Sequence, residues 1–590
     1  MLLAWALLFL LGSFHFLFVA RLERPGADSS AYIVLAEQLC RHGKYEFNFA
    51  PHVKYPPGFP LILAGWMLVS GQFQYEQLLR LIPVLGVAGL AVWFSVLRSS
   101  FAPCPAAFAV LLTAVSLPYF DMATRSLMAD SPFLLMSGLC FLLLWRLGAP
   151  CRRPNRLQMM GVGALLLFSA VAVLIRNAGI AIGIGFLCWA LLPPVRRAPH
   201  WRRARNLAIL AGISCLLGLL AWVAWSRSHK DSFLTDWHMS GYTSEFLYKD
   251  PLQPDLGFAT MTDYAKRMAN NALVRAAQIA SVAIPINWLS TVWYSPIVLF
   301  TLLLPMAGIW SSRHEPCKLL FGLYMLAYLA LYALWPFVEN ARFVIPIAPV
   351  TFLFVLEGAR WLKQYYLRHN KKITAMVVAI ASLAFCTALR HPPTGKQEIL
   401  ALLFWAVAAL SVTVVLLVPK ASAVFEHLDG ILAHWGKLPA AALAAVLVGW
   451  GLTGQVVAGN ENLHPNPSGF RNENSRRAAL WLRQAPPGNV MAGNVAVIHR
   501  LTGRFTAFFP PTADEQAILD AIRHHQVRFL VVCRLRAGEQ PYFRPSEEQR
   551  LHRLQRLAPY LLRLVHESPD YFIFETDSSI WNASPPVYRP

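Results

Sequence analysis

The amino-acid sequence predicts a mainly α-helical, polytopic membrane protein of about 13 transmembrane helices that ends in a small α/β domain. Of its 590 residues, 56% are hydrophobic and only 14% are charged, and the mean hydropathy is +0.45. Soluble proteins average about 25% charged residues, so a soluble chain could not bury this much apolar surface. The composition also excludes collagen-like and disordered chains, and nine scattered cysteines argue against a disulfide-rich secreted protein.

The span count rests on apolar stretches of about 20 residues, the length that crosses a hydrocarbon layer of roughly 30 Å. Thirteen such stretches begin near residues 1, 80, 102, 131, 158, 178, 207, 291, 319, 343, 373, 399 and 439. The first one has no basic segment before it and no small-residue cleavage site before Arg21. We therefore expect it to be retained rather than removed as a signal peptide.

The sidedness of the chain follows from its basic residues, which gather in alternate short loops on the side of the N-terminus. They are Arg146, Arg152, Arg153, Arg156, Arg196, Arg197, Arg202, Arg203, Arg205, Arg360, Lys363, Arg368, Lys371 and Lys372. Such loops lie in the cytoplasm, which places residues 21–79, 227–290 and the tail outside. This bias explains much of the net charge of +21, and without a basic, aromatic-interleaved module we expect no nucleic-acid partner.

The domain organisation predicted here is a transmembrane domain over residues 1–457 and an extracytoplasmic α/β domain over residues 458–590. In the tail, helical and strand periods alternate. The predicted helices cover residues 474–484, a short segment after residue 492, 513–525 and 546–566, and the predicted strands cover 489–492, 504–509, 527–533 and 571–575. Its one cysteine, Cys533, cannot provide a disulfide framework, so the domain must supply its own core.

Candidate chemistry concentrates in the outer loops, because the sequence contains no Walker loop, strand-linked GxGxxG, HExxH or paired CxxC motif. In the first loop, Asp28 follows the first span closely, a short amphipathic helix is expected from Ser30 to Leu39, and Lys54 and Tyr55 precede two prolines. The apolar stretch 59–69 is too short to span and should lie at the interface. Asp28 and Tyr55 also have simpler interpretations. Asp28 could cap the amphipathic helix and pair with Arg24, and Tyr55 could be one of the tyrosines that line a membrane interface.

The second outer loop and two later span ends add further charges. Arg125 and Asp130 flank the start of the fourth span, where Asp130 has an equally good interpretation as a helix cap. Arg176 and Arg342 lie at outer span ends, with Glu339 beside Arg342. Arginines on this side run against the positive-inside bias, and a bound anion would explain them, although snorkelling arginines are common.

Together, these loops place carboxylates and cations at the level of lipid headgroups on one membrane face. Attack on a sugar carried by a lipid phosphate needs a carboxylate that accepts the proton of the incoming hydroxyl. The departing phosphate needs positive charge. The arrangement therefore favours glycosyl transfer from a lipid-linked donor.

At these residues the chain resembles the GT-C superfamily of integral-membrane glycosyltransferases, which includes aminoarabinose transferases of lipid A and protein O-mannosyltransferases. The resemblance rests on Asp28 followed by AYIVLAEQL, on the segments YPPGFPLILA, RSLMADSPFLL and ARFVIPIAP, and on LTGRF in the tail. It covers nearly the whole chain through the order and sidedness of these short motifs. Many relatives carry a second acidic residue directly after the first aspartate, where this chain has Ser29.

The resemblance implies a GT-C fold and an inverting transfer of a sugar from a polyprenyl-phosphate donor to a glycan, lipid or protein acceptor at the outer face of a bacterial cytoplasmic membrane. It implies Asp28 as the catalytic base and Asp130 as a second acidic residue. Lys54, Arg176 and Arg342 would neutralise the donor phosphate, and Tyr55 would line the pocket. Arg125 and Glu339 complete the expected substrate-binding set, and no cofactor is expected, because Ser29 and the lack of ligand spacing give a divalent metal no support.

Two other classes of function stay open at this stage. A lipid-linked sugar flippase, another transporter or a glycan polymerase would also handle such a donor, although the sequence shows neither clear repeats nor a convincing midplane carboxylate. A structural membrane protein that presents its α/β tail to partners is the other alternative. The sequence does not identify the sugar, the acceptor or the oligomeric state.

Overall fold

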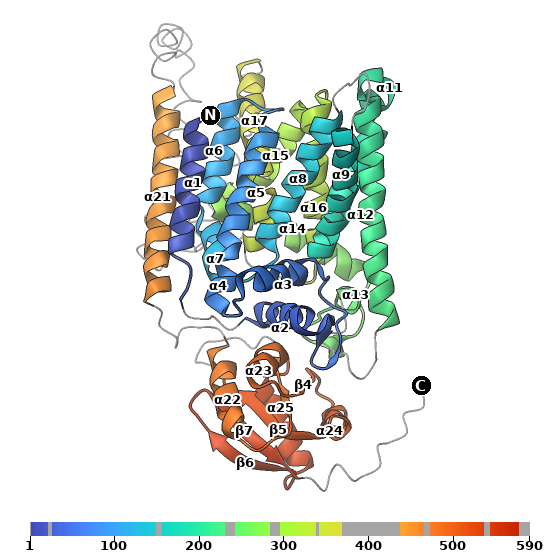
Figure 1. Cartoon of the computed structure of the whole chain (residues 1–590), viewed down its shortest axis with the longest axis vertical. Coiled ribbons are helices and arrows are strands. Elements are labelled where there is room, and N and C mark those ends of the chain that lie inside the picture. The colour runs from blue at the N-terminus through green and yellow to red at the C-terminus, as the bar shows by residue number, and fades with distance from the viewer. Residues whose placement is uncertain are drawn as a thin grey trace.

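The computed structural model describes residues 2–21, 26–148, 156–229, 242–283, 296–337, 341–368, 437–464, 472–535 and 543–577. A bundle of long helices forms one region, and an α/β domain lies against one end of it (Figure 1). The bundle contains α1 (Leu2–Leu17), α5 (Leu81–Leu97), α6 (Pro103–Ala114), α7 (Leu117–Arg125), α8 (Asp130–Gly148), α9 (Arg156–Ile175), α10 (Ile180–Leu191), α12 (Arg202–Ser228), α14 (Met261–Ala283), α15 (Pro296–Ser311), α16 (Pro316–Leu334), α17 (Ala348–Arg368) and α21 (Lys437–Leu463).

These helices make the chain a multi-pass membrane protein. Six of the described helical segments are long and apolar enough to cross a membrane, or seven if α6 and α7, which meet at 56°, form one broken span. The count of thirteen spans is therefore not confirmed. Helices do occur at or close to the expected positions, except near residues 373 and 399, which lie outside the described residues.

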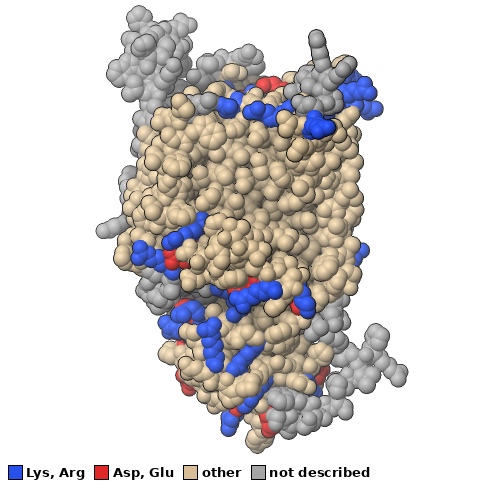
Figure 2. Space-filling view, viewed as in Figure 1, with Lys and Arg blue, Asp and Glu red and all other residues tan. Residues whose placement is uncertain are grey.

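The surface of the bundle shows an apolar belt between two charged zones (Figure 2). Lysine and arginine side chains line the rim at one end and form a second band where the bundle meets the α/β domain. The short helix α11 (Pro193–Arg197), which carries Arg196 and Arg197, lies at the rim far from that domain (Figure 1). Basic loops and the tail thus occupy opposite ends of the bundle, as the positive-inside pattern predicts.

The first outer region forms a layer between the bundle and the α/β domain. It contains α2 (Ala27–His42), the two-stranded hairpin β1 (Glu46–Phe47) and β2 (Ala50–Pro51), α3 (Gly58–Ser70) and α4 (Tyr75–Leu79). Pro56 and Pro57 end the preceding loop and α3 begins at Gly58, where a Cβ would lie 2.7 Å from the backbone of α9. Only glycine lets α3 approach α9 this closely, which fixes the loop before it.

The second outer region is packed more closely than a free loop. It contains α13 (Tyr242–Leu247), the 3-10 helix Pro254–Leu256 and the whole of the bundle helix α14, which packs against α15, α16 and the 3-10 helix Ala341–Ile347. Two shorter 3-10 helices, Asn177–Gly179 and Pro199–Trp201, precede α10 and α12. Residues from α14 therefore reach the same end of the bundle as the first outer region.

The C-terminal domain is a five-stranded mixed sheet with helices packed on it. Its elements are α22 (Glu473–Gln484), β3 (Asn489–Ala492), α23 (Val495–Thr502), β4 (Thr506–Phe508), α24 (Glu515–His524), β5 (Val527–Cys533), α25 (Glu547–Leu557), β6 (Leu562–Glu567) and β7 (Tyr571–Thr576). The strand order is β4-β3-β5-β7-β6, with β3 parallel to β4 and β5 and with β7 antiparallel to both β5 and β6. The α/β class expected for the tail is confirmed.

One element of the tail was predicted wrongly. The helix expected over residues 546–566 ends at Leu557, and β6 follows it. Pro559 interrupts the helical pattern, and the residues from Leu562 to Glu567 pair with β7 as an antiparallel strand with one register shift. A strand was thereby mistaken for the end of a helix.

The α/β domain contacts both outer regions. The side chain of Asn48 in the β1–β2 turn donates to the carbonyl of Thr506 and accepts from its N–H, each at 2.9 Å. Asp255 accepts from the Thr512 hydroxyl at 3.0 Å and from the Ala513 N–H at 2.7 Å. α21 continues past residue 457 to Leu463, and α22 begins the domain at Glu473.

Candidate active site

A large cavity lies where the bundle, the two outer regions and the C-terminal domain meet. Its volume is 1610 Å³. Six of the sequence-predicted residues line it: Asp28, Lys54, Tyr55, Asp130, Arg176 and Arg342. Side chains that are up to 314 positions apart in the sequence thus share one cavity.

Asp28 lies in the first turn of α2 and points its carboxylate into the site. The N-cap residue of α2 is Gly26, and it makes no side-chain cap bond, so α2 begins earlier than the expected Ser30 and Asp28 is not its cap. Arg24, the alternative partner, lies outside the described residues. The Tyr55 hydroxyl donates to Oδ1 of Asp28 at 2.7 Å, and Arg342 lies 3.4 Å from Oδ2.

Tyr55 is held by a rigid loop rather than lying in an interfacial belt, since its side chain is buried. Its N–H donates to Nε2 of His52 at 2.9 Å, and the His52 ring stacks on its ring. Trp225 and Ser226 at the end of α12 donate to the carbonyls of His52 and Val53 at 3.1 and 2.9 Å. Burial, together with Lys54, lowers the pKa of His52 to about 3, so this histidine is a neutral acceptor that fixes the loop.

Lys54 forms a buried ion pair that the sequence did not predict. Its Nζ lies 2.7 Å from Oε1 of Glu245 in α13, and both residues are buried. The ammonium also lies over the rings of Tyr55 and Tyr242, at 5.8 and 5.6 Å from their centroids. Glu245 and Tyr242 lie in a short segment without a recognisable motif, so the sequence carried no signal for them.

Asp130 pairs with Arg176 in the wall of the cavity. Asp130 is the first residue of α8, at the start of the fourth predicted span. Its carboxylate also forms an ion pair with the guanidinium of Arg176. The Nε of Arg176 donates to the Tyr332 hydroxyl at 3.0 Å. Asp130 thus supports an arginine in addition to the N-terminus of a span.

Three guanidinium groups surround one aromatic ring. Arg176, Arg275 and Arg342 lie 4.7, 5.6 and 5.0 Å from the centroid of Phe343. Arg275 was missed by the sequence reasoning, because it lies within α14, in a region interpreted as an outer loop. An amphipathic helical period from Met261 onwards was the signal that could have revealed it.

Two predicted residues fall outside this arrangement. Arg125 does not line the cavity; it pairs with Asp121 and with Glu461 of α21, each at 2.9 Å, and holds the bent helix α7 against α21. Arg125 thus lies outside the cavity wall that the other predicted residues share. Glu339 lies outside the described residues, and the carboxylate found beside Arg342 is Asp28.

The charges of the cavity wall suit an anionic ligand and, beside it, a group that gives up a proton. Eight lysine or arginine residues and six aspartate or glutamate residues line the cavity, an excess of positive charge. Among the residues that the structure describes, no three histidine, cysteine, aspartate or glutamate side chains gather as a metal site. The wall can thus hold a phosphate with guanidinium and ammonium groups while Asp28 offers a carboxylate beside it.

Comparison with models of protein families and with curated protein sequences finds no match. Among solved structures, the chain is similar to ArnT from Cupriavidus metallidurans bound to undecaprenyl phosphate, with 15% identity, a TM-score of 0.50 and 98% of each chain covered. The apo state of that protein gives 14% identity and the same TM-score over the same coverage. A third similar structure is the archaeal oligosaccharyltransferase AglB from Archaeoglobus fulgidus, in complex with an inhibitory peptide and a dolichol-phosphate. Its sequence identity is 12% and its TM-score 0.48, and the match covers 90% of this chain and 69% of AglB.

The identity to ArnT is low but its coverage is nearly complete in both chains. The match includes the helical bundle as well as the C-terminal sheet, since 98% of this chain is covered. The expected fold, a helical membrane bundle followed by a small C-terminal α/β domain, is therefore confirmed as similar to that of ArnT.

Proposed function

We propose that this chain is an inverting glycosyltransferase that moves a sugar from a polyprenyl-phosphate donor to an acceptor at the outer face of a bacterial cytoplasmic membrane. The observation that carries the proposal is the Asp28 carboxylate, held by Tyr55 and flanked by Arg342 in a cavity with an excess of positive charge. The similar ArnT structure contains undecaprenyl phosphate, which supports a lipid phosphate as the ligand of this cavity.

The proposed reaction is a single displacement at the anomeric carbon of the donor sugar. The acceptor hydroxyl oxygen forms the new bond to that carbon as the bond to the phosphate oxygen breaks, and the phosphate leaves with the electron pair. Asp28 accepts the hydroxyl proton, because a carboxylate placed beside the nucleophile makes it more reactive as the bond forms. Tyr55 donates to Oδ1 at 2.7 Å and so fixes the orientation of the carboxylate.

Positive charge at the leaving group comes from three side chains in this proposal. Arg342 lies next to Asp28, Lys54 lies behind Tyr55, and Arg176 is held by Asp130 and Tyr332. Fixed cations in a site shielded from water stabilise the charge that develops on the departing phosphate. Asp130 is a positioning residue here, since its contact is to Arg176.

Transport of a lipid-linked sugar is the second candidate. The helices α2 and α13, which carry the cavity residues Asp28 and Glu245, lie at the end of the bundle next to the C-terminal domain (Figure 1). A transporter binds its substrate near the middle of the membrane, between repeats that rock against each other. The location of the charges at one end favours transfer chemistry.

The test incubates the purified chain in lipid nanodiscs with a panel of radiolabelled polyprenyl-phosphate sugars and with a membrane extract of the source organism. Transfer predicts label in an acceptor fraction and release of unlabelled polyprenyl phosphate in equal amount. If every donor stays intact but crosses the bilayer of sealed proteoliposomes in the presence of the chain, the proposal is wrong and transport replaces it.

A further inference from the structure

The C-terminal domain presents a topological switch point to the cavity. From β3 the chain crosses through α23 to β4 on one side of β3, and it then crosses through α24 to β5 on the other side. In open α/β sheets, ligands bind outside the carboxyl ends of such parallel strands, where the connections diverge. In this domain that place is the crevice after Ala492 of β3 and Cys533 of β5.

The residues of that crevice line the large cavity. Gly493 and Asn494 follow β3, Arg534 follows β5, and Glu547 begins α25 beside them. The cavity is therefore continuous from the candidate base Asp28 in the bundle to the switch point of the sheet. A molecule that reaches Asp28 from outside has this crevice as one of its walls.

Glu547 is the acidic group of this wall. Its Oε2 accepts from the Cys533 N–H at 2.8 Å, and burial raises its pKa, with Arg550 opposing that rise. A Cβ on residue 493 would overlap Oε1 of Glu547, so Gly493 is what admits the carboxylate to the N-terminal end of α23. An acceptor group and helix N–H donors thus lie side by side.

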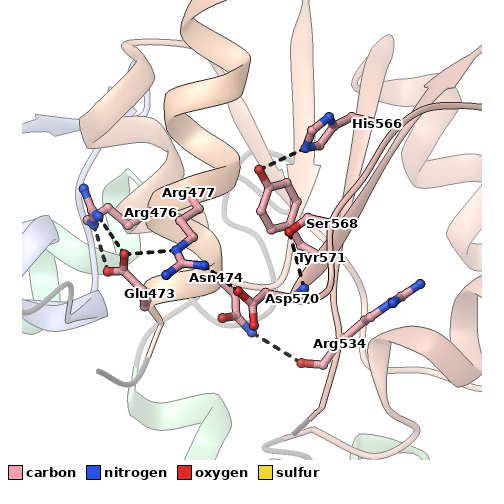
Figure 3. A network of polar contacts seen from close by, with 9 residues as sticks. All are labelled: Glu473, Asn474, Arg476, Arg477, Arg534, His566, Ser568, Asp570 and Tyr571. Atoms are coloured by element: carbon pink, nitrogen blue, oxygen red, sulfur yellow. Dashed lines mark hydrogen bonds and ion pairs between the residues drawn. The ribbon is translucent and has the colours of Figure 1, made fainter. Parts of the chain in front are cut away.

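Other charges near the crevice are paired with one another, as Figure 3 shows for the end of α22. In the first turn of α22, Glu473 binds Arg476 and Arg477 binds Asp570. Arg534 binds Glu567 at 2.7 Å. Asn474 donates its Nδ2 to the Arg534 carbonyl at 3.4 Å. Its buried Oδ1 has no hydrogen-bond partner among the described residues.

We propose that the switch-point crevice formed by Asn474, Gly493, Asn494 and Glu547 is the acceptor subsite, and that it binds a hydroxyl-rich carbohydrate portion of the acceptor. This inference rests on the proposed transferase function and specifies its acceptor class. Carboxylate and amide oxygens accept hydrogen bonds from sugar hydroxyls, and helix N–H groups donate to them. A neutral polyol uses both kinds of group at once.

The charges argue against other occupants. A phosphate would suit the N-terminal end of α23, but Glu547 would repel it at short range. Phe543 and Leu535 supply apolar surface in the same wall, against which the faces of a sugar ring can pack. A sugar-bearing acceptor is therefore favoured over an anionic lipid headgroup without sugar or an acidic peptide.

The test measures transfer from a radiolabelled polyprenyl-phosphate sugar to a membrane extract of the source organism, with the full-length chain in nanodiscs. The native chain should label the glycolipid or glycan fraction. Glu547→Gln keeps an oxygen for the Cys533 N–H but removes the charged acceptor, so the amount of extract that gives half-maximal rate should rise about tenfold. Half-saturation by the donor should stay the same.

Glu548→Gln is the matched control, because Glu548 is the next residue of α25 and does not line the cavity; it should behave as the native chain. Asn474→Ala should raise half-saturation by acceptor about threefold through loss of one neutral hydrogen bond. Label in the protein or sugar-free lipid fraction, or native half-saturation in Glu547→Gln, overturns the subsite while transfer itself stands. An inactive native chain that still binds donor overturns the transferase proposal instead.

Discussion

The wall of the cavity contributed by the bundle and the wall contributed by the C-terminal domain hold different kinds of side chain. The bundle and its outer helices supply ion pairs, such as Lys54 with Glu245 and Asp130 with Arg176. The C-terminal wall supplies amides, the carboxylate of Glu547 and two arginines that are engaged within the domain, Arg534 with Glu567 and Arg550 with the carbonyls of Phe509 and Pro510. A buried ion pair costs desolvation free energy, and apolar side chains of the same size would often stabilise the fold as well or better. The ion pairs of the bundle wall therefore indicate a site for a charged ligand, whereas the C-terminal wall suits a neutral one.

The largest effect of a single substitution on stability is expected at the Asp130–Arg176 pair. Asp130→Ala leaves the Arg176 guanidinium without its carboxylate and should lower the free energy of unfolding by about 3 to 5 kcal/mol. Thermal unfolding in detergent measures it. Asp121→Ala, at a carboxylate 44% exposed, is the matched control and should cost about 1 kcal/mol or less; equal losses in both variants would contradict the special role of the buried pair.

The Lys54–Glu245 pair separates ligand binding from stability. Lys54→Met alone leaves a buried glutamate unpaired and should cost about 3 kcal/mol. The double variant Lys54→Met with Glu245→Leu should recover most of that loss, because two apolar side chains replace two charges. Its affinity for undecaprenyl phosphate should still fall about tenfold in a binding titration; native affinity in the double variant would show that Lys54 serves the fold alone.

A smaller effect on stability is expected at the contact between the first outer region and the C-terminal domain. Asn48→Ala removes both hydrogen bonds to Thr506 and should cost about 1 to 3 kcal/mol. Hydrogen exchange should quicken at β4 and leave the helical bundle unchanged. Asn48 has φ +55°, so Asn48→Gly, which tolerates that φ, isolates the loss of the hydrogen bonds; native exchange at β4 in both variants would mean that other contacts join the domain.

Sequence patterns predicted those elements whose apolar residues recur with the spacing of a helix or a strand. β3 and β5 have the predicted bounds, Asn489–Ala492 and Val527–Cys533, because both are central strands with continuous apolar runs. β6 lies at the sheet edge, and its polar, exposed residues resemble the surface of a helix. Whether this segment forms a strand depends on its pairing with β7, and the local sequence pattern carries no information about that pairing.

The candidate site was predictable in part for a similar reason. Asp28, Lys54, Asp130, Arg176 and Arg342 were predicted to share one membrane face from topology alone. Their partners could not, because Glu245 of α13 reaches Lys54, and Arg275 of α14 reaches the ring of Phe343, through packing between distant segments. Arg125 shares the topology but turns to α21, since a residue at the right membrane level can face either way.

The measurement that tests the central claim most directly compares transfer with donor binding in Asp28→Asn. The amide keeps the size of the side chain and an oxygen for the Tyr55 hydroxyl, but it cannot take up the proton of the acceptor. The account predicts that glycosyl transfer falls about a hundredfold or more while undecaprenyl phosphate still binds. Transfer within about threefold of the native rate, well short of a general-base loss, would contradict it.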